Sequence, residues 1–410
     1  MILQIIISLG GMLVLLGIAL ALSSNRKAIN VRTIGGAFAL QLLIGAFVLY
    51  TSIGQDVLNA MASGVNAVIT QSKVGTEFLF GDLAKFKVGF VFAINVLTVI
   101  IFFSSLIAVL YYLGIMQLVI RFIGGGIQKL LGTSRPESLS ATANIFVGQT
   151  EAPLVVKPFI PTMTQSELFA IMVGGLASVA GTVLAGYAGL GADMKFLIAA
   201  SFMAAPGGLL MAKIIMPETE EPHQNFDEVL DDADKPANVI DAAAVGASNG
   251  LRLAVNVGAM LIAFVGLIAL LNFWLGGIGE YFGVQGLTFQ GLLGWFFSPI
   301  AFVLGVPWSE AHQVGSLIGQ KLILNEFVAY MDFANIKDSL SPTSQAIATF
   351  ALCGFANLSS IAILLGGLGS LAPSRRHDIA RMGIKAVIAG TLSNLMSATI
   401  AGIFLTLATL

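Results

Sequence analysis

The chain has very few of the residues on which enzymes and metal sites are commonly built. It contains a single cysteine, Cys353, and three histidines among 410 residues. One cysteine excludes an intrachain disulfide and a multi-cysteine metal site. The sequence has no H-E-x-x-H pair and no P-loop. Residues 246–250 match the G-x-S-x-G pattern of serine hydrolases, but no strand is predicted before them and no histidine is placed to serve the serine. The sequence therefore argues against an enzyme.

Charge is scarce as well. Only 10% of the residues are charged and 57% are apolar, whereas a typical globular domain is roughly 25% charged. The formal net charge is −2 and no basic stripe is present, so nucleic acid is not expected as a partner. Several apolar runs exceed the ~20 residues needed to cross ~30 Å of hydrocarbon. The first run, 2–22, lacks a basic start and a small-residue cleavage site, so we interpret it as a retained helix.

These runs predict an all-α polytopic membrane protein with eight transmembrane helices and two re-entrant helical hairpins. The eight predicted spans are 2–22, 34–53, 88–117, 167–190, 194–214, 252–275, 344–370 and 381–408. Residues 134–163 and 309–338 are polar in the middle, and each half is too short to cross the bilayer. Each segment is therefore predicted to form a hairpin that enters and leaves the membrane on the same side. Residues 54–85 mix polar and apolar side chains and predict an amphipathic helix on the membrane surface.

Basic residues predict the orientation. Most lysines and arginines of the short loops follow spans one, three, five and seven. The positive-inside rule places these loops in the cytoplasm, with both termini outside. Lys85 and Lys87 are the main exceptions. Residues 217–241 hold a dense acidic run, which we interpret as a solvated cytoplasmic tether, with an acidic docking or cation-collecting segment as the alternative.

The two halves of the chain repeat one pattern. A hairpin tip with an acid, Glu151 in the first half and Glu326 in the second, is followed by an apolar segment interrupted by small and polar residues at 175–181 and 354–360. One more span follows each of these segments. The first hairpin would enter from the cytoplasm and the second from outside, so the repeat is inverted, as in many secondary transporters. A carboxylate at bilayer depth costs roughly 2.5–3.5 kcal/mol on insertion scales, and interrupted backbone is tolerated there only where it lines a cavity. The pattern predicts a binding site where the two tips meet the two broken helices.

Helix-capping residues support these boundaries. Thr164 and Glu167 form a capping box directly after the first hairpin. Ser341 and Pro342 supply an N-cap and a first-turn proline directly after the second hairpin.

The order of elements divides the chain into four predicted parts. They are a scaffold part with spans one to three and the surface helix (1–133), a first transport repeat (134–214), the acidic linker with a scaffold span (215–308), and a second transport repeat (309–410).

In these segments the chain resembles the concentrative nucleoside transporters over nearly its whole length. The most specific matches are the tip 148–153, the stretch 319–327 and the motif 353–360. The chain is similar to the short bacterial form with eight spans. The resemblance implies a homotrimer in the bacterial inner membrane with one pathway in each protomer. It also implies a rigid scaffold domain and a transport domain that carries the hairpins and broken helices across the membrane as an elevator.

The resemblance also implies which residues bind the substrate. Gln149 and Glu151 would hydrogen-bond the nucleobase, with Thr150 nearby through water, and Val183 and Phe355 would pack against the base. An amide can serve both donor and acceptor edges of a base, and an aromatic ring can stack on it.

The ribose hydroxyls would be held by Glu326, Asn357 and Ser360. A ribose diol offers two donors, which suits a carboxylate acceptor. The expected substrate is a uridine-like nucleoside. The sequence does not rank purine against pyrimidine nucleosides as substrates.

For the coupling ion, the resemblance implies a sodium site made of the Asn144 and Ser178 side chains and the backbone carbonyls of Asn144, Val147, Ser178 and Val179. Carbonyls of unwound helix together with neutral side-chain oxygens suit a hard monovalent cation. Some bacterial relatives couple to protons, and the presence of both Asn144 and Ser178 favours sodium. The paired acids and the ion site favour coupled transport over a passive channel. Proton coupling, or another small polar solute such as a dicarboxylate, is the alternative, although two buried acids would repel an anion at low dielectric.

Overall fold

The computed structural model describes residues 2–85, 87, 89–222 and 236–409, and these residues form helices and loops without a strand. The acidic run within 217–241 lies largely outside the described residues. The elements of the first half are α1 (Ile2–Ala21), α2 (Val31–Tyr50), α3 (Ser52–Phe80), α4 (Phe92–Asn95), α5 (Leu97–Tyr112), α6 (Ile115–Leu131), α7 (Arg135–Ala143), the 3₁₀ helix η3 (Ala152–Thr162), α8 (Gln165–Ala177), α9 (Gly181–Gly189) and α10 (Met194–Ile215). Those of the second half are α11 (Val239–Tyr281), α12 (Phe289–Val303), α13 (Trp308–Ile323), α14 (Glu326–Ile336), α15 (Pro342–Leu352), α16 (Ser360–Gly366), α17 (Leu368–Leu371) and α18 (Arg376–Ala408).

The all-helical fold class is confirmed. Seven spans of the described chain are long and apolar enough to cross a membrane, and the bent pair α12–α13 would make an eighth. These seven include all the predicted spans except 344–370. That span appears as the short helices α15, α16 and α17, because residues 353–359 leave the helical conformation. The predicted break in the fourth span is present too, between α8 and α9.

Three boundaries differ from the prediction. The third span ends at Gly114, whose positive φ of 78° is a left-handed conformation suited to glycine, and an unpredicted helix, α6, follows. Helix α12 was missed, because its 15 residues fall short of a full span. The chain bends by 115° between α12 and α13. Helix α11 runs over 43 residues and extends well beyond the predicted 252–275.

The two hairpins are built differently. The second consists of two α-helices, α13 and α14, joined at residues 324–325. In the first, α7 is followed after the tip by η3, which is a 3₁₀ helix containing Pro158 and Pro161. Proline removes a backbone donor and disfavours a regular α-helix. Both predicted caps are present: Thr164 and Glu167 form a reciprocal capping box, and Ser341 accepts from the backbone of Ser344.

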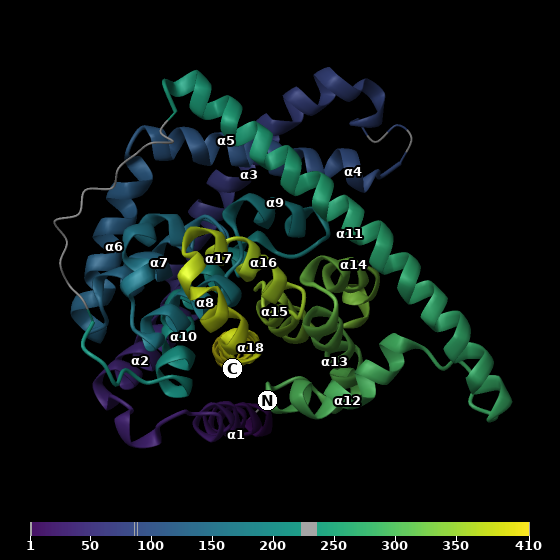
Figure 1. Ribbon diagram of the computed structural model, residues 1–410. Coiled ribbons are helices and arrows are strands. Elements are labelled where there is room, and N and C mark those ends of the chain that lie inside the picture. Colours follow the sequence, from purple (N-terminus) through teal and green to yellow (C-terminus); the bar gives the residue numbers. More distant parts are fainter. Residues whose placement is uncertain (1, 86, 88, 223–235, 410) are drawn as a thin grey trace.

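The core is gathered around α18, which lies near the centre of Figure 1 with α8, α10 and α15 packed against it. These helices are almost entirely buried, whereas α1, α2, α3 and α11 leave large apolar side chains exposed. In a soluble protein such exposure would favour aggregation; in a bilayer it is the surface that faces lipid or another subunit.

Helix α11 crosses the outside of the molecule and packs closely against α5. Gly246 and Gly250 lie at this contact: a Cβ at Gly246 would be 2.7 Å from the Ser104 carbonyl oxygen, and one at Gly250 would be 2.8 Å from the Ile101 Cα. Two glycines four residues apart allow two helix backbones to approach closely. The G-x-S-x-G segment is therefore a helix-packing motif inside α11, without the strand and turn that a nucleophile needs.

We expect Gly250→Leu to force α11 away from α5 and to lower the free energy of unfolding by about 1–3 kcal/mol, the usual cost of overpacking. Thermal unfolding of the detergent-purified protein measures this. Gly266→Leu on the same helix is the matched control, because no heavy atom lies within 4 Å of its Cβ position. Equal unfolding temperatures for the two variants would contradict the packing role.

Candidate functional site

The interrupted segments of the two repeats meet inside the core. The Phe355 backbone N–H in the second break donates to the Ser178 carbonyl in the first, at 3.1 Å. Each break also bonds to the hairpin of its own repeat: Gly181 N–H donates to Phe146 O at 3.0 Å, and Leu358 N–H donates to Leu322 O at 3.1 Å. Backbone groups that the helices leave unpaired are thus satisfied by other interrupted backbone. The result is a polar centre in an otherwise apolar core.

Glu326 is the central acid of this region. It is the first residue of α14, where the positive end of the helix dipole favours a carboxylate, and it is only 4% exposed. Its Oε1 accepts a hydrogen bond from the Tyr187 hydroxyl at 3.0 Å, and its Oε2 accepts one from Asn357 Nδ2 at 3.1 Å. The side chain of Asn325 caps the helix by accepting from Val328 N–H. The carboxylate is therefore fixed by two donors from two different broken helices.

Asn357 connects this acid to the next polar residue. Its Oδ1 accepts from the Ser360 N–H at 2.9 Å, which orients the amide so that its nitrogen faces Glu326. The Ser360 hydroxyl donates to Phe355 O at 2.6 Å. The Gln149 amide nitrogen, from the first hairpin tip, reaches the same hydroxyl at 3.5 Å. Four of the expected substrate residues (Gln149, Glu326, Asn357 and Ser360) therefore form one connected group.

The Gln149 side chain has an unused hydrogen-bond acceptor. Gln149 is 5% exposed, and its Oε1 is buried without a hydrogen-bond partner. An unsatisfied buried acceptor costs about 1–3 kcal/mol. A bound molecule that offers an N–H or O–H at this point would recover that cost, so Gln149 is suited to recognise a polar ligand.

The side chains of the other expected substrate residues make no hydrogen bond to this connected group among the described residues, although the Phe355 carbonyl accepts from Ser360. Val183 is buried in α9, and Phe355 is partly buried in the second break. Thr150 packs near Gly367, at the junction of α16 and α17. Glu151 is exposed, and its carboxylate lies beside Gly148. The structure thus places the two tip acids in different environments, one exposed and one buried.

Sequence reasoning missed Tyr187, which holds Glu326. Its ring stacks on Tyr330 with centroids 4.5 Å apart and also packs on Phe327 at 4.8 Å. Tyr187 follows Val183 by one helical turn on α9, so it shares a face with a residue already assigned to the site. That periodicity is the signal that could have found it.

Asn394 on α18 was missed as well. Its Nδ2 donates to Ala177 O at 2.5 Å and to Cys353 O at 3.0 Å, which are carbonyls at the ends of α8 and α15. The Asn394 side chain therefore hydrogen-bonds to the backbone at both breaks. A Cβ on Gly354 would overlap this amide, so glycine is needed there.

The residues assigned to the coupling ion lie between α7 and the first break. Asn144 is 1% exposed and donates from Nδ2 to Ser140 O at 2.9 Å, while its Oδ1 is buried without a hydrogen-bond partner. The Ser178 hydroxyl donates to Gly174 O at 3.0 Å, which leaves its lone pairs free to accept. Val147, a few residues after Asn144, and Val179, directly after Ser178, are buried as well. An unpartnered neutral oxygen and a free hydroxyl lone pair fit a monovalent cation.

Carboxylates, thiolates and imidazoles do not cluster into a metal site anywhere in the described residues. A site for a transition metal or a divalent cation normally uses such ligands. The donor set around Asn144 is uncharged, which suits an ion of lower charge.

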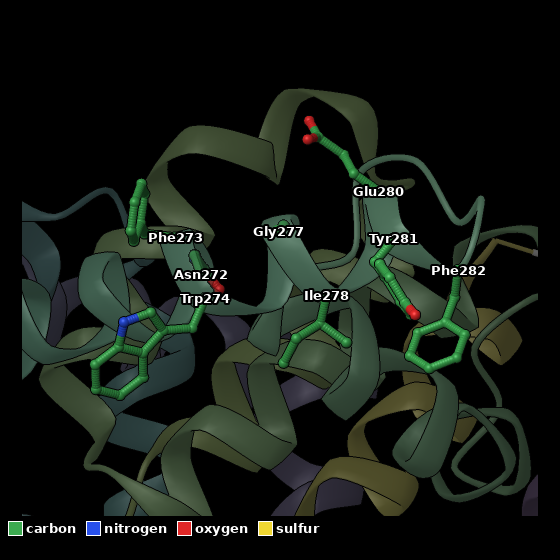
Figure 2. Close-up of a pocket in the computed structure, with 9 residues that line it drawn as sticks. Asn272, Phe273, Trp274, Gly277, Ile278, Glu280, Tyr281 and Phe282 are labelled. Atoms are coloured by element: carbon green, nitrogen blue, oxygen red, sulfur yellow. The ribbon is translucent and has the colours of Figure 1, made fainter.

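Two hollows on the surface are separate from this polar centre. A hollow of about 900 Å³ lies at the C-terminal end of α11, where Figure 2 shows Phe273, Trp274, Tyr281 and Phe282 around it. Aromatic residues gather in this way at membrane–water interfaces. An apolar hollow of about 480 Å³ lies among α2, α6 and α10. Neither is lined by a residue expected to bind substrate.

Comparisons with known proteins cover almost the whole chain. The family models for the N-terminus and C-terminus of Na+-dependent nucleoside transporters match residues 10–83 and 196–402, and a nucleoside-recognition model matches 93–194. An uncharacterized transporter of Haemophilus influenzae is 58% identical over 98% of both chains. The nucleoside permease NupC of Helicobacter pylori is 54% identical over 99% of both chains. The mouse sodium/nucleoside cotransporter 1 is 38% identical over 97% of this chain and 63% of its own length.

Solved structures agree with this. The structure of CNTnw in an inward-facing substrate-bound state matches with a TM-score of 0.95 and 58% identity over 98% of both chains. A substituted CNTnw in an outward-facing state matches with a TM-score of 0.94 and 57% identity, again over 98% of both chains. Together these matches identify a multi-pass membrane transporter rather than an enzyme. The chain belongs to the family of Na+-dependent nucleoside transporters.

Proposed function

We propose that this chain imports uridine-like nucleosides across the bacterial inner membrane by symport with sodium. The observation that carries the proposal is the buried Glu326 carboxylate, held by Tyr187 and Asn357 where the two broken helices meet. Each carboxylate oxygen receives one protein donor and retains acceptor capacity, so a vicinal diol can add a hydrogen bond to each. A ribose supplies such a diol.

The base would lie towards the first hairpin tip. Gln149 contributes its unpartnered Oε1, Val183 and Phe355 contribute apolar surface, and Thr150 and Glu151 complete the tip. In this structure Glu151 is exposed and its carboxylate lies beside Gly148 at the same tip. A dicarboxylate fits poorly, because Glu326 would repel it at low dielectric.

Sodium is the coupling ion that the donor set favours. The orphaned Asn144 Oδ1 and the free lone pairs of Ser178 lie next to the first break, together with the carbonyls of Val147 and Val179. A coupling proton at this position would need a titratable group. The amide and the hydroxyl that stand at these positions do not titrate near neutral pH. The proposed sodium ion would contact both the first break, through Ser178, and the first hairpin, through Asn144. The tip of this hairpin carries Gln149, which we propose binds the base.

Import would follow an elevator mechanism in a homotrimer with both termini outside. The transport domain would consist of 134–214 and 309–410, and the scaffold of 1–133 with α11 from 215–308. The exposed apolar faces of α1, α3 and α11 are suited to lipid and to subunit contacts. The similarity to both an inward-facing and an outward-facing structure of CNTnw supports a mechanism with alternating access.

We expect Glu326→Gln to weaken uridine binding about 10- to 150-fold, since hydrogen bonds to a charged group contribute about 1.5–3 kcal/mol. Uptake at low substrate concentration should nearly vanish. Uridine affinity of the purified protein and uptake normalised to surface expression measure the two effects. Asp338→Asn, which neutralises an exposed acid after the same hairpin, is the matched control and should behave as the unsubstituted chain. Normal uptake by Glu326→Gln would refute the ribose assignment.

Asn144→Ala and Ser178→Ala should each raise the sodium concentration for half-maximal uptake about 2- to 12-fold, equivalent to the loss of one neutral ligand of about 0.5–1.5 kcal/mol. The measurement is uptake in proteoliposomes against sodium concentration, with thermal unfolding recorded in parallel. Ser298→Ala serves as the control, since its hydroxyl makes the same bond one turn back in α12, away from the breaks. An unchanged sodium dependence in both variants would place the ion elsewhere or favour protons.

A further inference from the structure

Lys321 is a buried cation next to the second hairpin tip and is not among the residues proposed to bind substrate or sodium. It is 1% exposed in the last turn of α13, directly before the tip of the second hairpin. Its Nζ donates to Asn394 Oδ1 at 2.6 Å and to Ala351 O at 3.1 Å. Both acceptors are neutral. A buried charge is costly unless its environment stabilises it, and besides the two neutral acceptors the Glu326 carboxylate attracts this ammonium through space.

The place of Lys321 in its repeat corresponds to the place of the ion residues in the other. Asn144 ends the first helix of hairpin one, and its amide packs against Gly174 in the last turn of α8. Lys321 lies in the last turn of the first helix of the second hairpin, and its ammonium contacts Ala351 in the last turn of α15. The same number of residues separates Glu151 from the first break at Ser178 as separates Glu326 from the second at Cys353.

Both half-helices present the same physical problem. The C-terminal end of an α-helix carries unpaired carbonyls and a partial negative charge. In the core of a membrane protein no bulk water relieves this. Asn394 supplies one donor to each end, through Ala177 O and Cys353 O. The end of α15 receives an ammonium in addition, whereas the end of α8 lies beside the uncharged side chains of Asn144 and Ser178.

We propose that the Lys321 ammonium is a built-in cation that occupies, in the second repeat, the position equivalent to that of the coupling ion in the first, and so excludes a second coupling ion. The inverted repeat would otherwise create two cation positions. Only the position beside Asn144 is then free to exchange its ion with solution. This inference builds on the proposed sodium site, and its test separates the two.

The test is the number of radioactive sodium ions bound per protomer in the purified, detergent-solubilised protein. Lys321→Ser removes the ammonium and leaves a hydroxyl in a vacated space beside Ala351 O and Asn394 Oδ1. We expect this variant to bind one sodium ion more than the unsubstituted chain. Lys321→Arg keeps the charge and should show no gain.

Folding is monitored by thermal unfolding in sodium chloride and in choline chloride. A second bound ion stabilises the native state by mass action, so Lys321→Ser should be stabilised by sodium more steeply than the unsubstituted chain. A variant that folds only in sodium would also support the proposal. If Lys321→Ser folds and binds no additional sodium, or unfolds equally in both salts, the proposal is overturned.

The unsubstituted chain tests the proposed function separately. If it binds no sodium, sodium coupling at Asn144 and Ser178 is wrong. The difference between Lys321→Ser and the unsubstituted chain still decides the role of the lysine, because the expected gain of one ion does not depend on the starting number.

Discussion

The structure depends on the backbone that two helices leave unpaired in the middle of the apolar core. Where α8 and α15 end, carbonyls and N–H groups must find partners without bulk water. The chain supplies them from itself: Phe355 bonds to Ser178 across the two breaks, and Asn394 reaches the ends of both helices. The hairpins are needed for the same reason, because Phe146 and Leu322 complete the pairing.

The same constraint produces the chemistry of the site. Interrupted helices bring polar side chains to depth, and their ends provide dipoles that charged or polar groups can use. Glu326 lies at the start of α14, while Lys321 lies at the end of α13, so one hairpin tip stabilises charges of both signs within a few residues. The acid faces the proposed substrate and the lysine faces the break. The first repeat carries the uncharged side chains of Asn144 and Ser178 at the corresponding place, where we propose that the exchangeable ion binds.

Much of the fold could be predicted because it depends on local sequence patterns. Apolar runs, the caps at Thr164 and Ser341, and polar interruptions gave the spans, hairpins and breaks. The prediction failed where local pattern is ambiguous: α12 is too short for a span, and the turn at Gly114 sits in a continuous apolar run. Of the candidate site, sequence motifs pointed to Gln149, Glu326, Asn357 and Ser360, which the structure joins into one group. The bonds of Tyr187, Lys321 and Asn394, however, join segments 30 to 217 residues apart. Such pairing depends on tertiary packing, and so does the exposure of Glu151.

Sodium symport of nucleosides is tested most directly by uridine accumulation in proteoliposomes under an inward sodium gradient, an inward proton gradient, or neither. We expect accumulation above equilibrium with the sodium gradient alone. Accumulation with protons alone would contradict the ion site at Asn144 and Ser178 while leaving the substrate site in place. No uridine uptake under any gradient would contradict the assignment of Glu326 and Gln149 to a nucleoside of this kind.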